Sequence, residues 1–599
     1  MKRHTKKDKI RGRRTNMRQK KESRSIQPIQ EKGSNETINE EKSGGDPAIN
    51  TTDFLPHLDE AFKKVPEIGD GSRWYDLPYS ILSNLLQGKC RRFIPAKTRV
   101  TLNSAINYLI QFNEHERHAA WSRDDLLHNL KVPSSEHVTV PAIWVVELFP
   151  PSHIENLAKA IDKNSWDKER VRYGISEANQ EVLERSRAGK GSIWWELGEI
   201  ISENSHSLSG RAKRQALPAE FDNIKVYGLQ VGEGLTAVLA QFALSSSASQ
   251  HLDSVWHIDH EPKLIWSAGR LKAEDRHWSG LRRTQEARRS LHQKARSWLY
   301  QEAPGVFATN AEQQPLVDLL LLDEFDPSPG RQIERNFSSA IRALGLTRFE
   351  VEHISCANAP GLLLEKVDTV LCPTFKDDNT WTLWGKRESI ANGIGDTSIY
   401  SQNKDSAITY ILGQSLRDFF ALLAISNLLQ LFEGKYAELR DESRTRHKHF
   451  KGRHLKRLRS DFLTLSLDVS SLVRDIDAFN ARTWRYANDI RFNLSNPPWV
   501  IEKLERAGKK SAESIDLIDM LQARHIKQAR ELAVVDKDYR EVLSTVASLG
   551  ASIDTIKVSR VAIWVSLASL LVALVTLLVA DIKTSAPLFS LMKWIVSLF

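Results

Sequence analysis

The stretch Leu532-AVVDKDYREVLSTVASLGASIDTIKVSRVAIWVSLASLLVALVTLLV-Ala580 joins a soluble helical pattern to a membrane-like pattern without a break. In its first half, apolar residues recur at alternating spacings of three and four, which is the heptad pattern of a coiled coil. This seam consists of Leu532, Val535, Tyr539, Val542, Val546, Leu549, Ile553 and Ile556. Because such a seam needs a partner helix, it predicts a coiled-coil stalk in a homo-oligomer.

The second half of the stretch has the length and composition of a transmembrane helix. Residues 561–580 carry no charged side chain and are flanked by Arg560 and Asp581. Twenty helical residues rise about 30 Å, which matches the hydrocarbon core of a lipid bilayer. We therefore expect a stalk helix over 511–560 that continues directly into a transmembrane helix over 561–580.

Small and hydroxyl-bearing residues form a second stripe along this helix, and their alternating spacing of three and four continues into the apolar segment. In and next to that segment, the hydroxyl-bearing residues of the stripe are Ser559, Ser566, Ser569 and Thr576. Small residues let helices pack closely, and hydroxyls can also face water in a pore or bond to their own backbone. The stripe predicts either a packed oligomer face or a pore-lining face.

The net charge of +9 comes from the N-terminal end of the chain. Residues 1–24 contain twelve Lys or Arg against Asp8 and Glu22, so the rest of the chain is close to neutral. Residues 1–52 have little apolar surface to bury, which predicts a disordered basic tail. We expect the tail to contact anionic lipid headgroups or to act as a solubilising tail. Without a recognition motif or interleaved aromatic residues, specific nucleic-acid binding is not expected.

Cysteine usage and the N-terminus indicate the compartment. Cys90, Cys356 and Cys372 form neither a disulfide framework nor a metal-binding pair. The basic N-terminal region is not followed by an apolar run, as a signal peptide would be. We therefore expect an integral protein of the cytoplasmic or inner membrane, with its soluble bulk in the cytoplasm.

The predicted fold class is an α/β or α+β cytoplasmic domain, followed by an α-helical bundle, a coiled-coil stalk and a C-terminal transmembrane helix. The soluble part is divided into a helical segment over 53–138, an α/β domain over 139–400 and a helical bundle over 401–510. After Ser401 only helices are expected, including a buried one over 416–432 and another over 455–494.

Within the α/β domain, residues 141–149 and 316–322 form continuous apolar runs that predict buried strands. Residues 226–231 and 235–244 flank Gly232-Glu233-Gly234, which predicts a β-hairpin. Ser152 and Glu155 fit a helix capping box.

Two motifs suggest chemistry in this domain. Residues 319–324, Leu-Leu-Leu-Leu-Asp-Glu, resemble the acidic strand of a nucleotide-binding site, but the chain has no phosphate loop G-x-x-x-x-G-K-[ST]. His257, Asp259 and His260 are the candidate metal ligands, because strand alternation would place His257 and Asp259 on one face. The alternative is that they are hydrogen-bonded structural residues. No complete catalytic or nucleotide-binding motif is present, so an enzyme is not favoured, and the sequence does not identify a cofactor.

A basic cluster lies in the connection between the first two bundle helices. Its members are Arg444, Arg446, Lys448, Lys451, Arg453, Lys456, Arg457 and Arg459. If neighbouring helices are antiparallel and the stalk leads to the membrane, this connection lies near the bilayer and can contact anionic lipid. A solvated loop is the alternative. Residues 581–599 are expected to form an interfacial helix or a second short membrane segment.

The layout over residues 401–599 resembles the CorA-type magnesium transporters: a helical bundle, a long stalk helix that continues into the first membrane helix, and a short apolar C-terminus. The resemblance implies a funnel-shaped pentamer whose first membrane helix lines a pore, with Ser566, Ser569 and Thr576 on the pore side. The Gly-Met-Asn loop of that family is absent, and residues 581–585 read Asp-Ile-Lys-Thr-Ser.

Two functions follow from this layout. The first is an oligomeric integral membrane protein whose cytoplasmic domain senses a signal and controls a CorA-like pore or another membrane effector. The alternative is a membrane-anchored scaffold, or an enzyme of unrecognised type, that uses the C-terminal helix only as an anchor.

Overall fold

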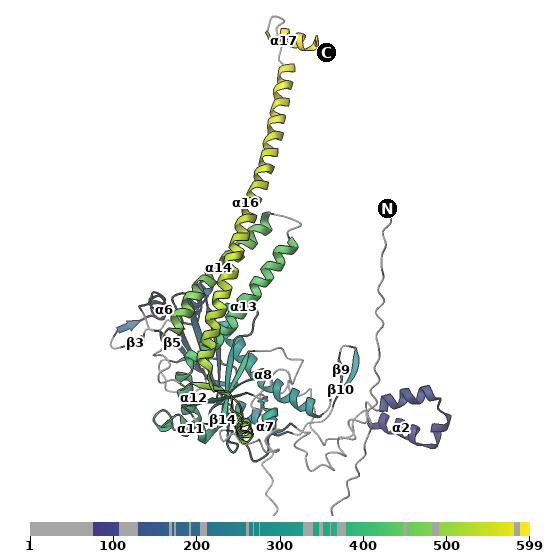
Figure 1. The fold of residues 1–599 in the computed structure, drawn as a ribbon, viewed down its shortest axis with the longest axis vertical. Coiled ribbons are helices and arrows are strands. Elements are labelled where there is room, and N and C mark those ends of the chain that lie inside the picture. Colours follow the sequence, from purple (N-terminus) through teal and green to yellow (C-terminus); the bar gives the residue numbers. More distant parts are fainter. Residues whose placement is uncertain are drawn as a thin grey trace, which may run out of the picture. The chain divides into compact units, whose positions relative to one another are not determined.

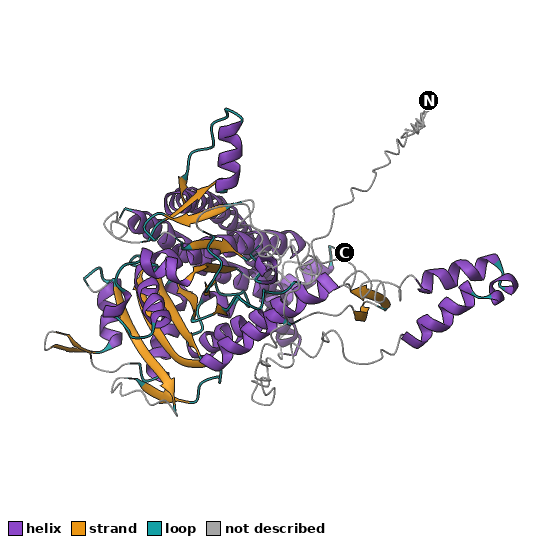
Figure 2. Cartoon of the chain, turned by 90° about the horizontal axis from the view of Figure 1, so that it is seen from below, coloured by secondary structure: helices purple, strands orange, loops and turns teal. Residues whose placement is uncertain are grey.

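Strand β2 (Ala142–Phe149) is buried along its whole length and lies inside a mixed sheet. Its side chains alternate between two apolar cores: Trp144 and Val146 belong to one, whereas Ile143 and Val145 belong to the other. Successive residues of a strand face opposite sides of the sheet, so a strand that is apolar at nearly every position needs a covering layer on both faces. The fold accordingly has helices on both sides of the sheet (Figures 1 and 2).

The computed structural model describes residues 76–106, 130–166, 170–172, 175–190, 193–203, 212–258, 263–267, 269–274, 276–327, 340–346, 352–359, 361–367, 379–446, 452–481, 490–579 and 587–598. The predicted basic tail over 1–52 lies outside these residues, as does most of the predicted helical segment over 53–138, in which α2 (Asp76–Gln87) and the 3-10 helix η2 (Lys89–Phe93) are described.

The main sheet has twelve strands in the order β16-β15-β12-β13-β14-β11-β2-β8-β7-β5-β6, and β1 pairs with the end of β11. Most neighbours are antiparallel, whereas β11–β14 and β5–β6 are parallel. The other strands of this sheet are β1 (Val138–Thr139), β5 (Trp194–Ser202), β6 (Lys213–Gln215), β7 (Phe221–Gln230), β8 (Thr236–Leu244), β11 (Leu316–Leu322), β12 (His353–Cys356), β13 (Leu363–Lys366), β14 (Thr380–Lys386), β15 (Phe492–Ser495) and β16 (Ile515–Asp516). Two separate hairpins pair β3 (Arg170–Arg172) with β4 (Ile175–Glu177) and β9 (Lys263–Ser267) with β10 (Arg270–Glu274).

The helices divide between the two faces. One layer contains α5 (Ile154–Lys163), α6 (Asn179–Arg187), α7 (Ser246–His257) and α8 (Arg276–Glu302). The other contains α9 (Val306–Thr309), α11 (Arg387–Gly393), α12 (Lys404–Ser415), α13 (Arg417–Arg446), α14 (Gly452–Asn480) and the first part of α16 (Leu517–Val579). Short helices are η3 (Pro151–His153), η5 (Thr397–Ile399), α15 (Pro498–Arg506) and α17 (Pro587–Val596), and residues 96–106 and 340–343 are also helical.

The predicted hairpin is confirmed as β7 and β8, and its turn is packed against α14. The backbone N–H of Gly234 donates to Asp475 Oδ2 at 2.9 Å. A Cβ atom at Gly234 would lie 1.6 Å from Ser471 Oγ, so the turn needs glycine for this close approach. The glycines therefore serve the contact between the sheet and α14.

Two expectations about secondary structure are wrong. Strands do continue after Ser401, because β15 pairs with β12 and β16 pairs with β15, and the helix expected to reach 494 ends at Asn480. The capping box at Ser152 does not form. Instead, Ser152 Oγ donates to Asp468 Oδ2 at 2.6 Å, and α5 begins at Ile154 without a side-chain cap. In both cases a contact with a distant part of the chain replaces the local pattern.

Candidate functional site

Helix α16 links the α/β core to the apolar segment as one continuous helix of 63 residues. Its first part packs against α13 and α14 (Figure 1). Ser426 Oγ lies 2.6 Å from His525 Nε2, and Tyr436 Oη donates to Asp536 Oδ1 at 2.9 Å. Both contacts join residues about 100 positions apart, so α13 and α16 run in the same direction.

The start of the predicted seam has its partner within the same chain. Leu532 is buried, and Tyr539 stacks on Tyr436 of α13 with 5.9 Å between ring centroids. Val535 is 37% exposed. The backbone of the remaining seam is helical, and the side chains of Val542, Val546, Leu549, Ile553 and Ile556 lie outside the described part of the structure. An intermolecular coiled coil over these residues stays a prediction.

The last part of α16 has the properties of a membrane-spanning helix. Val558–Thr576 is long and apolar enough to cross a bilayer, and none of its residues is buried within the chain. Ser559, Ser566 and Ser569 are exposed, whereas the Thr576 hydroxyl donates to the carbonyl of Val572 at 2.7 Å. The hydroxyl stripe therefore lies on an open surface, and at Thr576 it bonds to its own backbone.

Together, helices α12 and α13 also have the length and hydropathy of a membrane span that is broken by a bend of 60°. Their apolar residues are buried against the sheet, among them Phe419, Phe420 and Leu428. This confirms the prediction that residues 416–432 form a buried bundle helix. Among the described residues, Val558–Thr576 is therefore the exposed helix that is long enough to span a bilayer, and the shorter α17 also exposes apolar side chains.

The helix ends that flank the basic connection, Arg446 of α13 and Gly452 of α14, lie at the end of the helical layer that faces the apolar segment. Because α13 residues lie about 100 positions before their α16 neighbours, Arg446 is level with a point about 12 residues, or about 18 Å, before Val558. Arg457 and Arg459 are exposed. Lys448 and Lys451 lie outside the described residues, as do the side chains of Arg444, Arg446, Arg453 and Lys456.

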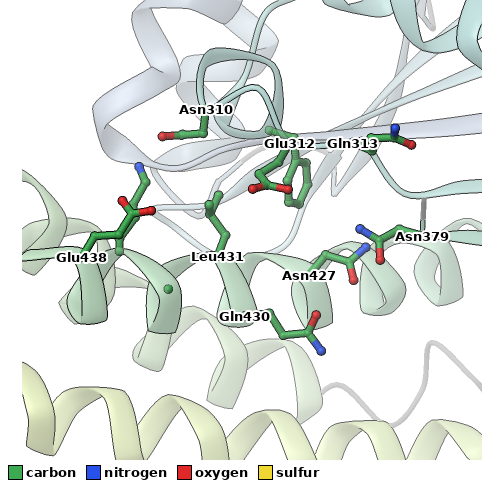
Figure 3. A pocket seen from close by; sticks show the side chains of 11 residues that line it. Asn310, Glu312, Gln313, Asn379, Asn427, Gln430, Leu431 and Glu438 are labelled. Carbon is green, nitrogen blue, oxygen red and sulfur yellow. The ribbon is translucent and has the colours of Figure 1, made fainter. Parts of the chain in front are cut away.

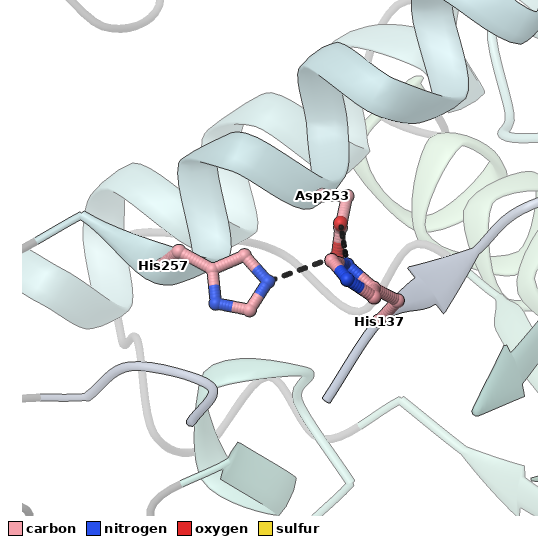
Figure 4. Close-up of side chains that lie close together, drawn as sticks. All are labelled: His137, Asp253 and His257. Carbon is pink, nitrogen blue, oxygen red and sulfur yellow. Dashed lines mark hydrogen bonds and ion pairs between the residues drawn. The ribbon is translucent and has the colours of Figure 1, made fainter. Parts of the chain in front are cut away.

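The prediction that His257 lies on a strand is wrong, because His257 is the last residue of helix α7. Asp259 and His260 lie outside the described residues. In place of these partners, His257 Nε2 lies 3.2 Å from Asp253 Oδ1, one helical turn earlier, and His137 Nδ1 lies 3.2 Å from Asp253 Oδ2 (Figure 4). We call His137, Asp253 and His257 the histidine–aspartate cluster.

The cluster is partly enclosed by the protein. The side chain of His137 is 64% exposed, whereas those of Asp253 and His257 are 17% and 22% exposed. Although burial lowers the pKa of His257, the hydrogen bond and charge of Asp253 outweigh burial and raise it. Sequence analysis missed His137 and Asp253, although Asp253 and His257 have the i,i+4 spacing that brings two ligands together on one helix.

The acidic residues that resemble a nucleotide-binding strand have structural partners. The backbone N–H groups of Asp323 and Glu324 donate to the buried carboxylate of Glu136, and Asp323 Oδ1 lies 3.2 Å from Arg387 Nη2. These contacts hold the loop that follows β11.

A polar cavity of about 250 Å³ lies between α13 and the loops at one end of the sheet (Figure 3). Helix α13 contributes Asn427, Gln430, Leu431, Gly434, Lys435 and Glu438, helix α9 contributes Phe307, and the facing loops contribute Asn310, Glu312, Gln313 and Asn379. Amide and charged side chains dominate this lining, which suits a polar ligand. The cavity could not be predicted from local patterns, because its lining comes from three separate segments of the chain.

Comparison of the chain with protein-family models, with curated proteins and with solved structures finds no match in any of the three.

Proposed function

We propose that this chain is an oligomeric integral membrane protein in which the cytoplasmic α/β domain senses a signal and controls a CorA-like pore or another effector in the bilayer. One observation carries the proposal: α16 is packed into the core at its start and ends in an exposed apolar segment, with no break between the two parts. A rigid helix transmits displacement over its length, whereas a flexible linker would serve for anchoring alone.

The polar cavity supports a sensory role for the soluble domain. Lys435 lines the cavity, and its neighbour Tyr436 donates to Asp536 of α16. A polar ligand bound between α13 and the facing loops would therefore contact α13, which is the helix that packs against α16. This arrangement offers a route from a soluble ligand to the apolar segment, through two adjacent residues of one helix.

The membrane effector is proposed from the exposed stripe of hydroxyl side chains. Ser566 and Ser569 face outward from the single chain, and further copies of α16 would cover the apolar surface of Val558–Thr576. Anionic lipid headgroups are the proposed partners of the basic connection. The backbone hydrogen bond of Thr576 favours the alternative, in which the stripe only packs and the helix serves as an anchor.

The proposal is tested by the subunit count of the full-length protein in detergent, measured by light scattering with the detergent contribution removed, together with ion flux into vesicles. We expect a ring of subunits and a flux that Ser566→Leu or Ser569→Leu reduces. Ser566→Ala, which keeps the residue small, is the matched control. A monomer or dimer, or a flux that both leucine variants leave unchanged, would contradict the pore.

A further inference from the structure

We propose that His137, Asp253 and His257 form a binding site for a divalent transition-metal ion of the zinc type. Their ligand atoms all lie within 4.8 Å of one another (Figure 4). Nitrogen and carboxylate ligands held about 2.0–2.2 Å from a tetrahedral ion are about 3.3 Å apart. His137 Nδ1 lies 3.2 Å from Asp253 Oδ2 and His257 Nε2 lies 3.2 Å from Asp253 Oδ1, so each imidazole nitrogen has this spacing from one of the two carboxylate oxygens.

The hydrogen bonds of His257 determine which of its nitrogens can bind a metal. Nδ1 lies 3.1 Å from the carbonyl oxygen of Val132. Because a carbonyl only accepts, Nδ1 carries the proton, and in the neutral ring Nε2 presents its lone pair to Asp253. Two acceptors cannot face each other at 3.2 Å without a positive charge between them. That charge is either a second proton or a metal ion, and a backbone carbonyl on the other nitrogen is the usual support of a metal-binding histidine.

The backbone around the cluster is fixed by contacts of its neighbours. Val132 donates its N–H to the carbonyl of Trp256, so this strand-like segment is tied to the end of α7. On either side of His137, the buried carboxylate of Glu136 accepts from the loop after β11, and the N–H of Val138 donates to Asp253 Oδ1 at 2.9 Å. The backbone at His137 is therefore fixed, whereas its exposed ring can rotate to complete the coordination of a metal ion.

The ligand set indicates the class of metal. Two imidazoles and one carboxylate suit zinc and its neighbours in the first transition series, whereas magnesium and calcium prefer oxygen ligands alone. Three protein ligands leave a fourth position for water or another ligand. The cluster belongs to the helical layer of α7, on the opposite face of the sheet from α16, so this inference is independent of the proposed membrane function.

The test uses full-length protein in detergent from which metals have been removed with a chelator. This protein is titrated with zinc chloride, and binding is measured by isothermal titration calorimetry. We expect one zinc ion per chain at this site. His137→Gln, Asp253→Asn and His257→Gln are each expected to weaken binding by about tenfold or more. Cobalt(II) provides a second readout, because its visible spectrum reports tetrahedral coordination, and each substitution should abolish that spectrum.

Two controls separate this site from other histidines. His153→Gln removes a partly buried histidine that contacts Ser152 and Thr309, and it should leave zinc binding unchanged. A triple glutamine variant at His447, His449 and His454 removes the histidine-rich connection and should also retain the ion. His137→Gln changes an exposed side chain, so it stays informative if the other two variants fail to fold. Absence of stoichiometric zinc, or zinc that persists in His137→Gln and is lost in the triple variant, would overturn the proposal.

Discussion

At the scale of single residues, a buried ion pair joins helix α8 to strand β11. Asp318 is the one charged residue of β11, and it lies among leucines. Arg288 of α8 donates to both of its carboxylate oxygens at 2.7 Å, and His292 Nε2 lies 2.9 Å from Oδ2. Although burial raises the pKa of Asp318, the charges of Arg288 and His292 outweigh it and hold that pKa well below its usual range.

Removal of this arginine is expected to destabilise the fold strongly. Arg288→Met leaves the fully buried Asp318 carboxylate with only His292, and breaking a buried pair in this way costs about 3–5 kcal/mol. Thermal denaturation measures the loss. Arg506→Met is the matched control, because Arg506 is 76% exposed beside the exposed Glu502 and its loss costs about 1 kcal/mol or less. Equal thermal midpoints for the two variants would show that the buried pair contributes no more than the surface pair.

The same residues show how far the sequence alone could lead. The apolar run over 316–322 predicted a buried strand, because this pattern depends only on neighbours in the chain. The pairing of Arg288 with Asp318 depends on which helix covers which strand. The histidine–aspartate cluster also depends on contacts between distant segments. His137 and Asp253 are 116 positions apart, so no local spacing relates them.

At the scale of elements, long strands could be predicted from the sequence, whereas short strands could not. The hairpin of β7 and β8 has long apolar runs and a glycine turn, and both strands form as expected. In contrast, β15 has four residues and β16 has two, and they exist because β12 and β15 offer them an edge. The interface of α13 with α16 could likewise not be predicted from the sequence, since the heptad pattern predicts a partner helix without identifying it.

That interface contains a buried histidine whose titration can be measured. His525 of α16 is fully buried beside Ser426, and burial, together with the charge of Arg524, lowers its pKa to about 4. Between about pH 6.5 and pH 4, the unfolded chain therefore binds a proton that the native chain does not, so stability falls as the pH falls. From this shift we expect a loss of about 3 kcal/mol at pH 4.

The measurement compares wild type with His525→Gln, which keeps a polar group near Ser426 and cannot take up the proton in this range. Thermal midpoints at pH 7 and pH 4.5 should fall more in wild type than in the variant, because all other titrating groups are shared. His353→Gln serves as a second comparison, since His353 also has a pKa lowered by burial and lies in β12, away from α16. A parallel fall of wild type and His525→Gln would contradict the proposed role of His525.

At the scale of the whole molecule, the contacts of α16 divide the chain into a folding part and a membrane part. Among the described side chains, contacts of α16 with α13 and α14 reach Tyr539 and Arg540, those of residues 542–557 lie outside the described part of the structure, and the exposed apolar segment begins at Val558. The α/β core already contains strands from both ends of the soluble sequence, including β15 and β16. The fold of this core should therefore not depend on the bilayer.

Truncation after Glu541 tests this division. The shortened chain keeps the described contacts of α16 with α13 and α14, and it loses the apolar segment and α17. We expect it to stay in solution without detergent and to unfold at the same temperature as the full-length protein, which should partition into membranes and resist extraction at alkaline pH. If the stalk beyond residue 541 assembles the oligomer, light scattering should also find the truncated chain monomeric. An insoluble product, or a lowered thermal midpoint, would show that residues 542–599 contribute to folding of the core, and membrane attachment and folding would then be a single process.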